Sequence, residues 1–403
     1  WLFKFSIGPG ADYTQPWGNP NSRDYYVTGT YNSSDIISYV ADPKLYTAAM
    51  SRSKSVVLDS GAFYASKTFD YNGTRLLFGW SPEERYAYDL IEPWGWAGAQ
   101  SLPRQIVPYP VTNSDESVSY YVRTPPLESV MQLLRNCTID GTGTSDTEVV
   151  TNCYGYQHYS SLSMSNNSTQ SLNNTSGQQL ELILYIDFST TETMVDGNMC
   201  GVRVLSNYTV GGTDTEYTDI GIQYSSNASF SGVSMYVNPS MSNADPNALV
   251  NRTSVSSNVL TMNTSASMFV ELRVIVDHSV VESFLEGGIQ AITRRIYPSN
   301  PTTSINVQLY SQCPSSTSCM CEFANVSSFI LRNANITTLP TVDTDTSSVS
   351  SSSKNSSDNT AVIATVTLVC LILAAVAGYL YYNRQQGTDV ANSKLLSVVD
   401  STL

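Results

Sequence analysis

Alternation of apolar and polar residues dominates the chain between residues 120 and 339. In "LELILYIDF", residues 180–188, every second side chain is apolar, from Leu180 to Phe188. A period of two places these side chains on one face of a strand. The stretch "ELRVIVDHSVVESFL", residues 271–285, alternates in the same way, breaks at Asp277-His278-Ser279 and then resumes. This predicts a hairpin, and regular short strands with polar turns favour a β-sandwich over this region.

The first 110 residues have a different pattern. Short strand signals, such as "DYYVTGTY", "GAFYASKTF" and "TRLLFGW", are broken by Gly, Pro and Asn. This is typical of β-propeller or barrel structure. A propeller blade takes roughly 40–45 residues, so that only about two blades fit and no ring can close. The one helix we expect between residues 120 and 339 is "LESVMQLLR", residues 127–135.

An uncharged apolar segment, "AVIATVTLVCLILAAVAGYLYY", occupies residues 361–382. Its length and hydrophobicity predict a single transmembrane helix. Residues 341–360 are rich in Ser and Thr and are interpreted as a stalk, and residues 383–403 as a cytoplasmic tail. Because every Asn-x-Ser/Thr sequon precedes the segment, the last at Asn355, we expect the large N-terminal region to be extracellular or lumenal, at the plasma membrane or in the endomembrane or vacuolar system.

Composition agrees with a secreted glycoprotein. Only 13% of residues are charged, and the net charge of −14 argues against nucleic acid as a partner. Six of the seven cysteines precede the apolar segment, which predicts disulfides but leaves their pairing open. Cys319-Met320-Cys321 does not have the spacing of a zinc site, and we expect no metal and no cofactor. The chain starts at Trp1 with neither Met nor a basic leader, from which we expect its N-terminal part to be missing.

Five ordered motifs together resemble glycoside hydrolase family 32, the invertases and fructan-processing enzymes. They are "RDYYVTGTY", "LDSGAFYASKTF", "RLLFGW", "WAGAQSLPRQI" and "LRVIVDHSVVESFLEGGIQAITRRIYP". The resemblance implies an all-β fold with a five-bladed β-propeller followed by a β-sandwich. It assigns residues 1–110 to the last blades of the propeller and residues 111–340 to the sandwich. It also implies hydrolysis of β-fructofuranosyl bonds with retention, without a cofactor.

Retaining hydrolysis requires two carboxylates about 5–5.5 Å apart, one as nucleophile and one as acid/base. The family resemblance also implies a further Asp that stabilises the transition state. The resemblance implies that these residues stand in three motifs: Trp-x-Asn-Asp-Pro for the nucleophile, Arg-Asp-Pro for the stabilising Asp and Glu-Cys for the acid/base. None of the three motifs is found in this chain. "WGNPNS" lacks the nucleophilic Asp, "RDY" is not Arg-Asp-Pro, and "CEF" reverses the order of the acid/base pair. We therefore expect no catalytic residue in this chain and place the catalytic trio upstream of it.

Four positions are candidates for contacts with sugar. Asn32 stands where family members tend to carry an Asp at the rim of the sugar site, and Tyr64, Trp80 and Trp96 are aromatic rings that could stack on a sugar. For the three aromatic residues, packing within the blades is the competing interpretation. Asp59 is interpreted as the cap of a turn with Ser60-Gly61, and His278 as a structural turn residue.

The leading hypothesis is the C-terminal piece of a membrane-anchored β-fructofuranosidase, with sucrose or a fructan-type saccharide as its partner. The alternative is a non-catalytic carbohydrate-binding or cell-surface adhesion glycoprotein that uses the same sandwich. Substrate preference, transferase activity and oligomeric state are left open. Because the sandwich strands are complete, the sequence also predicts that residues 118–340 fold alone.

Overall fold

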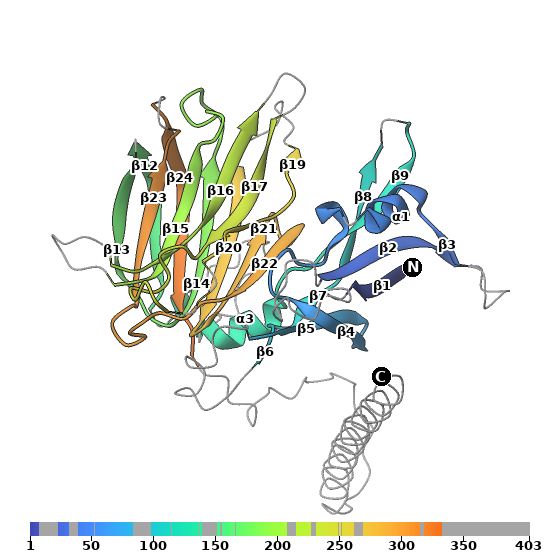
Figure 1. Ribbon diagram of the computed structural model, residues 1–403, viewed down its shortest axis with the longest axis horizontal. Coiled ribbons are helices and arrows are strands. Elements are labelled where there is room, and N and C mark those ends of the chain that lie inside the picture. The colour runs from blue at the N-terminus through green and yellow to red at the C-terminus, as the bar shows by residue number, and fades with distance from the viewer. Residues whose placement is uncertain are drawn as a thin grey trace, which may run out of the picture. The chain divides into compact units, whose positions relative to one another are not determined.

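The computed structural model describes most of the first 332 residues. The ranges it leaves out are 8–22, 32–38, 84–97, 139–150, 208–214, 227–230, 262–268 and 315–317, the single positions 52, 114, 136, 154, 166, 249 and 251, and everything after 332. All described residues belong to one compact unit, Trp1–Ile336. Its strands form two groups, the N-terminal strand group from β1 to β9 and the sandwich from β12 to β24 (Figure 1).

The first sheet of the sandwich has six antiparallel strands. Their order is β12 (Gln157–Ser165), β24 (Met320–Ile330), β14 (Gln179–Asp187), β20 (Phe269–Asp277), β21 (Val280–Leu285) and β22 (Gln290–Arg295). The predicted hairpin is confirmed, because Asp277 pairs with Val280 across a two-residue turn. His278 takes a positive φ of 52° in that turn, a conformation in which His is enriched.

The second sheet of the sandwich has seven strands. Their order is β13 (Ser168–Ser176), β23 (Asn306–Gln312), β15 (Met199–Ser206), β16 (Thr218–Ser226), β17 (Ser231–Asn238) and β18 (Val255–Ser256), and β19 (Leu260–Thr261) also pairs with β17. The two sheets share one hydrophobic core. The predicted inward face of β14 is confirmed, since Leu180, Leu182, Leu184 and Ile186 are at most 1% exposed. Each such side chain contributes roughly 1.5–3 kcal/mol of burial free energy.

Disulfides link distant parts of the sandwich. Cys200 on β15 is bonded to Cys321 on β24, so this bridge joins the two sheets through their core. Cys313 is bonded to Cys319 six residues later. Cys153 is also disulfide-bonded, and it lies opposite Cys137 in the small sheet of β10 (Cys137–Thr138) and β11 (Thr151–Cys153). The sequence predicted disulfides but could not give these pairings.

The N-terminal strand group contains two small sheets and a hairpin. The first sheet consists of β1 (Leu2–Ile7), β2 (Arg23–Tyr31) and β3 (Tyr39–Ala41). The second sheet consists of β4 (Tyr64–Tyr71), β5 (Thr74–Ser81) and β6 (Ala99–Gln100), and β7 (Arg104–Gln105) also pairs with β5. The hairpin consists of β8 (Val107–Thr112) and β9 (Val118–Arg123). Val122 of the hairpin packs in the same core as Tyr26 and Leu77. The predicted boundary between residues 110 and 111 stays a prediction, and it falls inside β8.

Two α-helices and a 3-10 turn complete the described chain. The helix expected at residues 127–135 is confirmed as α3 (Glu128–Arg135), which packs Met131 against the sandwich. The pattern did not predict α1 (Pro43–Met50), whose N-cap Asp42 accepts hydrogen bonds from Lys44 N and Leu45 N and whose first residue is proline. The 3-10 turn η1 covers Lys54–Val56.

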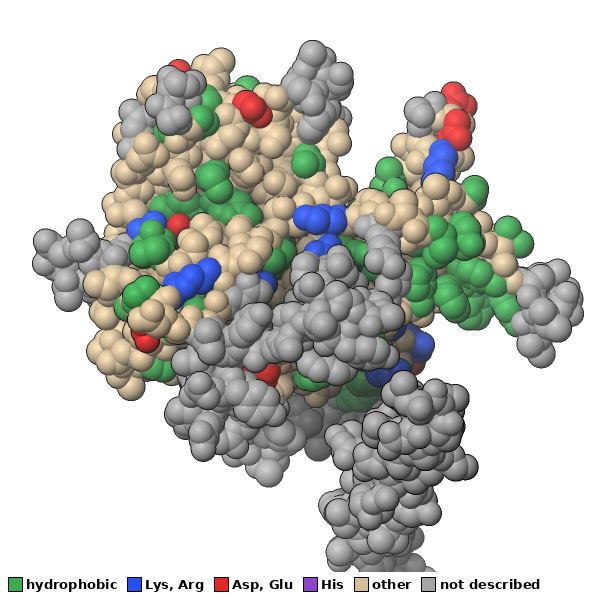
Figure 2. All heavy atoms as spheres, viewed as in Figure 1, with side chains coloured by type: hydrophobic (Ala, Val, Ile, Leu, Met, Phe, Trp, Pro, Cys, Tyr) green, Lys and Arg blue, Asp and Glu red, His purple; other side chains and the backbone are tan. Residues whose placement is uncertain are grey.

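Exposed hydrophobic side chains gather on the N-terminal strand group, over the sheet of β1 to β3 (Figure 2). Trp1 is 78% exposed, Val40 64% and Phe3 57%. Within the described ranges, the structure contains no helix with the length and hydrophobicity needed to cross a bilayer. The predicted transmembrane segment 361–382, the stalk and the tail lie outside the described residues.

Candidate functional site

The hairpin of β4 and β5 brings two of the predicted sugar-contact residues together. Tyr64 at the start of β4 lies directly opposite Trp80 near the end of β5. The hairpin turns at Asn72-Gly73, which take φ values of 50° and 76°. Both angles are left-handed, as this type of tight turn requires. Asn32 and Trp96, the other two predicted contacts, lie outside the described residues.

A cavity of about 430 Å³ lies beside Trp80, whose side chain is 41% exposed. Its lining residues are Ala65, Lys67, Phe78, Gly79, Trp80, Gly98, Ala99 and Gln100. Gly98 has a φ of +74°, and a Cβ atom at this position would lie 2.9 Å from Trp80 Nε1. Any residue other than glycine would therefore be strained here and would clash with the indole.

The lining of this cavity combines the partly exposed Trp80 with two polar residues, Lys67 and Gln100. That is the composition of a small-ligand site. Tyr64 is not among the lining residues, so the structure supports Trp80 more directly than Tyr64. No carboxylate from the described residues lines this cavity. Among all residues that the structure describes, no cluster of three or more His, Cys, Asp or Glu side chains is placed to hold a metal ion.

The buried carboxylates of the N-terminal strand group are bound by internal donors. Asp24, in the "RDY" motif, accepts hydrogen bonds from Ser66 N at 2.6 Å, from the Ser66 hydroxyl and from Ser6 Oγ at 2.5 Å, and Lys4 Nζ lies 3.5 Å away. These contacts join β1, β2 and β4. Asp24 therefore has a structural environment, not that of a catalytic acid.

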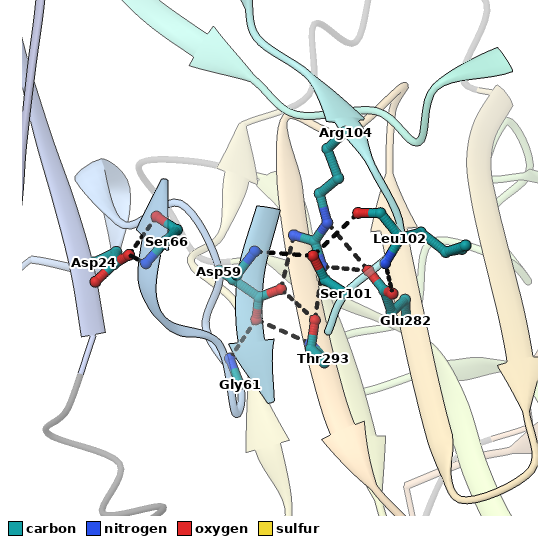
Figure 3. A network of polar contacts seen from close by, with 10 residues as sticks. Asp24, Asp59, Gly61, Ser66, Ser101, Leu102, Arg104, Glu282 and Thr293 are labelled. Carbon is teal, nitrogen blue, oxygen red and sulfur yellow. Dashed lines mark hydrogen bonds and ion pairs between the residues drawn. The ribbon is translucent and has the colours of Figure 1, made fainter. Parts of the chain in front are cut away.

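Arg104 is the centre of a second polar network, which joins the N-terminal strand group to the sandwich (Figure 3). Its Nη1 donates to Asp59 Oδ2 at 2.9 Å, and its Nη2 donates to Glu282 Oε2 at 2.6 Å. Nη2 also donates to Thr293 Oγ1 at 2.6 Å, which in turn donates to Asp59 Oδ2 at 2.7 Å. The guanidinium is fully buried between the rings of Phe63 and Phe284.

Electrostatics within this network follow from its burial. Burial lowers the pKa of Arg104, but the carboxylates of Glu282 and Asp59 raise it by more, so the net shift is upward. Burial also raises the pKa of the Glu282 carboxyl, and the Arg104 charge and the Leu102 N–H offset only part of that shift. Arg104 therefore stays charged and holds both carboxylates in place.

Asp59 also confirms the predicted turn, because its Oδ1 accepts the Gly61 N–H at 2.7 Å. The same segment pairs with the sandwich, since Ser60 N donates to Ala291 O and Ala62 N to Thr293 O. The sequence did not reveal the partnership with Arg104 and Glu282, because 178 residues separate those two. One signal was present, namely a glutamate within the apolar strand at residues 280–285, since buried carboxylates need a partner.

Two family models match the chain in order. The model described as "Glycosyl hydrolases family 32 N-terminal domain" matches residues 2–119, and "Glycosyl hydrolases family 32 C terminal" matches residues 151–325. The chain belongs to glycosyl hydrolase family 32. An acid beta-fructofuranosidase from Phaseolus vulgaris is 26% identical over 298 residues, which are 68% of this chain and 40% of that protein. A fructan 6-exohydrolase from Beta vulgaris is 27% identical, over 70% of this chain and 44% of that protein.

Solved structures show the same family 32 fold. The fructan 1-exohydrolase IIa of Cichorium intybus superposes with a TM-score of 0.59 at 18% identity, covering 77% of this chain and 55% of that one. An exo-inulinase from Aspergillus awamori gives a TM-score of 0.53 at 16% identity, covering 83% of this chain and 53% of that one. This family 32 chain thus spans about half the length, or less, of the relatives it matches.

Proposed function

We propose that this chain forms the C-terminal portion of a β-fructofuranosidase that hydrolyses terminal β-D-fructofuranosyl bonds of sucrose or fructans with retention. The observation that carries the proposal is the ordered match to both family 32 models. The named relatives, a β-fructofuranosidase and fructan exohydrolases, support fructosides as the substrate class. In this proposal the N-terminal strand group contributes the last blades of a five-bladed propeller.

The catalytic carboxylates are proposed to come from sequence outside this chain. Three of the described buried carboxylates, Asp24, Asp59 and Glu282, are held by internal donors, and no described carboxylate lines the cavity beside Trp80. A retaining mechanism needs two carboxylates about 5–5.5 Å apart that face the substrate. We therefore expect the full chain to release no reducing sugar from sucrose. Hydrolysis above a buffer blank by purified protein would overturn this assignment.

Binding to saccharide is tested separately from catalysis. The cavity beside Trp80 is proposed to contact the sugar, and 1-kestose is a suitable probe because the Cichorium intybus enzyme has been crystallised with it. Calorimetric titration of the full chain should show binding that Trp80→Ala weakens by about tenfold, or 1.4 kcal/mol. Tyr71→Ala is the matched control, because Tyr71 is an exposed aromatic residue of the same hairpin outside the cavity. Equal weakening by both variants would argue against the site.

A second candidate function is a non-catalytic carbohydrate-binding or adhesion glycoprotein. It is favoured by one observation, the lack of a described carboxylate along the Trp80 cavity. The full-length transcript distinguishes the two, because only the enzyme requires an encoded nucleophile and acid/base upstream of the matched region. Anchoring through residues 361–382 is part of both proposals. It is tested by carbonate extraction of membranes, which should leave an anchored protein in the pellet.

A further inference from the structure

A second cavity, of about 380 Å³, lies between the N-terminal strand group and the sandwich. We call it the interface cleft; among its lining residues are Lys54, Ser60, Tyr109, Tyr121, Leu260 and Gln290. It shares no lining residue with the cavity beside Trp80. The interface cleft is therefore separate from the proposed sugar site.

Lys54 brings a positive charge to the interface cleft, and none of the described carboxylates forms an ion pair with it. Its Nζ donates to Ser256 O at 2.6 Å and to Ser256 Oγ at 3.3 Å, and both acceptors are neutral. Burial lowers the pKa of Lys54, and the positive charge of Arg23 lowers it further.

Arg23 and Arg123 are two further cations that are poorly satisfied. Arg23 is only 8% exposed, and its Nε has no hydrogen-bond partner in the described part of the chain. Arg123 Nε is also buried without a partner among the described residues, and its guanidinium carbon lies 5.9 Å from the centroid of the Tyr109 ring, which lines the cleft. A buried N–H group without an acceptor is costly, so each of these two Nε groups would be stabilised by an acceptor.

No described carboxylate lines the interface cleft. Asp59 is the carboxylate whose charge acts on Arg23, but its oxygens are already bound by Arg104, Thr293 and Gly61. Lys54 is the one charged residue among the described lining residues, in a chain with a net charge of −14. The cleft also offers Gln290, whose Oε1 is buried without a described partner and can accept a hydrogen bond from a hydroxyl group.

We propose that the interface cleft binds a small oxyanion, a phosphate or carboxylate, either free or carried by a sugar. Lys54 in the lining supplies balancing positive charge, with Arg123 beside the lining ring of Tyr109 as a second cation, and the Gln290 amide oxygen accepts a hydrogen bond from a hydroxyl of the ligand. Charge-assisted hydrogen bonds to such groups are shorter and stronger than neutral ones. The proposal goes beyond the proposed fructosidase function, because sucrose and fructans carry no charge.

The experiment is calorimetric titration of the full chain with inorganic phosphate at constant ionic strength, with glucose 6-phosphate and glucose as further probes. We expect phosphate to bind with a dissociation constant of about 1 mM or below. Lys54→Met and Arg123→Met should each weaken binding by about tenfold or more. Lys44→Met is the matched control, because Lys44 pairs with Asp115 at the surface and does not line the cleft, and it should bind phosphate normally.

Tighter binding of glucose 6-phosphate than of phosphate would identify a sugar-borne oxyanion, and equal binding a free one; both support the site. Lys54→Arg keeps the charge and should retain phosphate binding, which separates loss of charge from misfolding. The proposal is wrong if phosphate does not bind at about 10 mM. It is equally wrong if Lys54→Met and Arg123→Met bind it like Lys44→Met. Neither result bears on 1-kestose binding at Trp80, so the two proposals fail independently.

Discussion

Replacing Arg104 by methionine should destabilise the protein strongly while keeping the shape of the side-chain stem. Arg104 is fully buried and balances two carboxylates, at 2.9 Å from Asp59 and 2.6 Å from Glu282. Removing one partner of a buried ion pair costs about 3–5 kcal/mol, because the remaining charge is left uncompensated. That loss is a large fraction of a typical folding free energy of about 5–15 kcal/mol.

Urea unfolding of the full chain at pH 7, followed by circular dichroism, measures this loss. Its cause is tested by Asp59→Asn and Glu282→Gln in the Arg104→Met background, which replace both carboxylates by neutral groups of similar shape. We expect this triple variant to recover much of the stability. Lys44→Met, which breaks an exposed ion pair, should leave the urea midpoint nearly unchanged.

The pH dependence provides a second check on Arg104→Met. Burial already raises the pKa of Glu282 with Arg104 present, and removing Arg104 raises it further. A carboxyl whose folded pKa lies above its unfolded value binds protons in the folded state, so the variant should gain stability as the pH falls from 7 towards 5. The reasoning is refuted if Arg104→Met loses less than about 1 kcal/mol, or if neutralising the carboxylates restores nothing.

Three further predictions concern the sandwich. Strand completeness predicts that residues 118–340 fold alone, but the contacts of Arg104 and Ser60 with the sandwich lead us to expect this fragment to be less stable than residues 1–340. Equal melting temperatures of the two fragments would contradict the second expectation. Replacing Cys200 and Cys321 by alanine opens a loop of 121 residues and should cost about 4 kcal/mol, measured by urea unfolding; an unchanged urea midpoint would count against it. Burial opposes ionisation of Glu216, but hydrogen bonds from Ser299, Ser304 and Ala244 outweigh this effect and lower its pKa. The free energy of unfolding should therefore fall as the pH drops below about 4.5, and the Glu216→Gln variant should lose less of it between pH 5 and pH 3. Identical acid profiles of the two proteins would rule this out.

The sequence predicted those parts of the fold that a local pattern determines. Alternation was enough for β14 and for the hairpin of β20 and β21, because one buried face imposes a period of two. The helix α1 was missed because its buried face consists only of Leu45 and Ala49, which is too little to show a helical period, although Asp42-Pro43 is a typical start.

Long-range contacts could not be predicted in the same way. The register from Tyr71 to Lys67 follows from the Asn-Gly turn, but the pairing of Tyr64 with Trp80 also depends on a register shift between Tyr64 and Lys67, which the local pattern did not indicate. The network of Arg104 was beyond local reasoning, because it joins three segments far apart in the chain: that of Asp59, that of Arg104, and the hairpin of β21 and β22 with Glu282 and Thr293. Its members are ordinary polar residues until folding brings them together. The interface cleft was missed for the same reason.

The pairing of Ser60 and Ala62 with β22 has a consequence for solubility. β22 is the last strand of its sheet, and an unpaired outer strand can recruit a strand from another molecule. Here the carbonyl groups of Ala291 and Thr293 already accept hydrogen bonds from within the same chain. The segment with Ser60 and Ala62 therefore protects the edge strand β22 from pairing with a strand of another molecule. A protein cleaved between this segment and the sandwich would become prone to self-association.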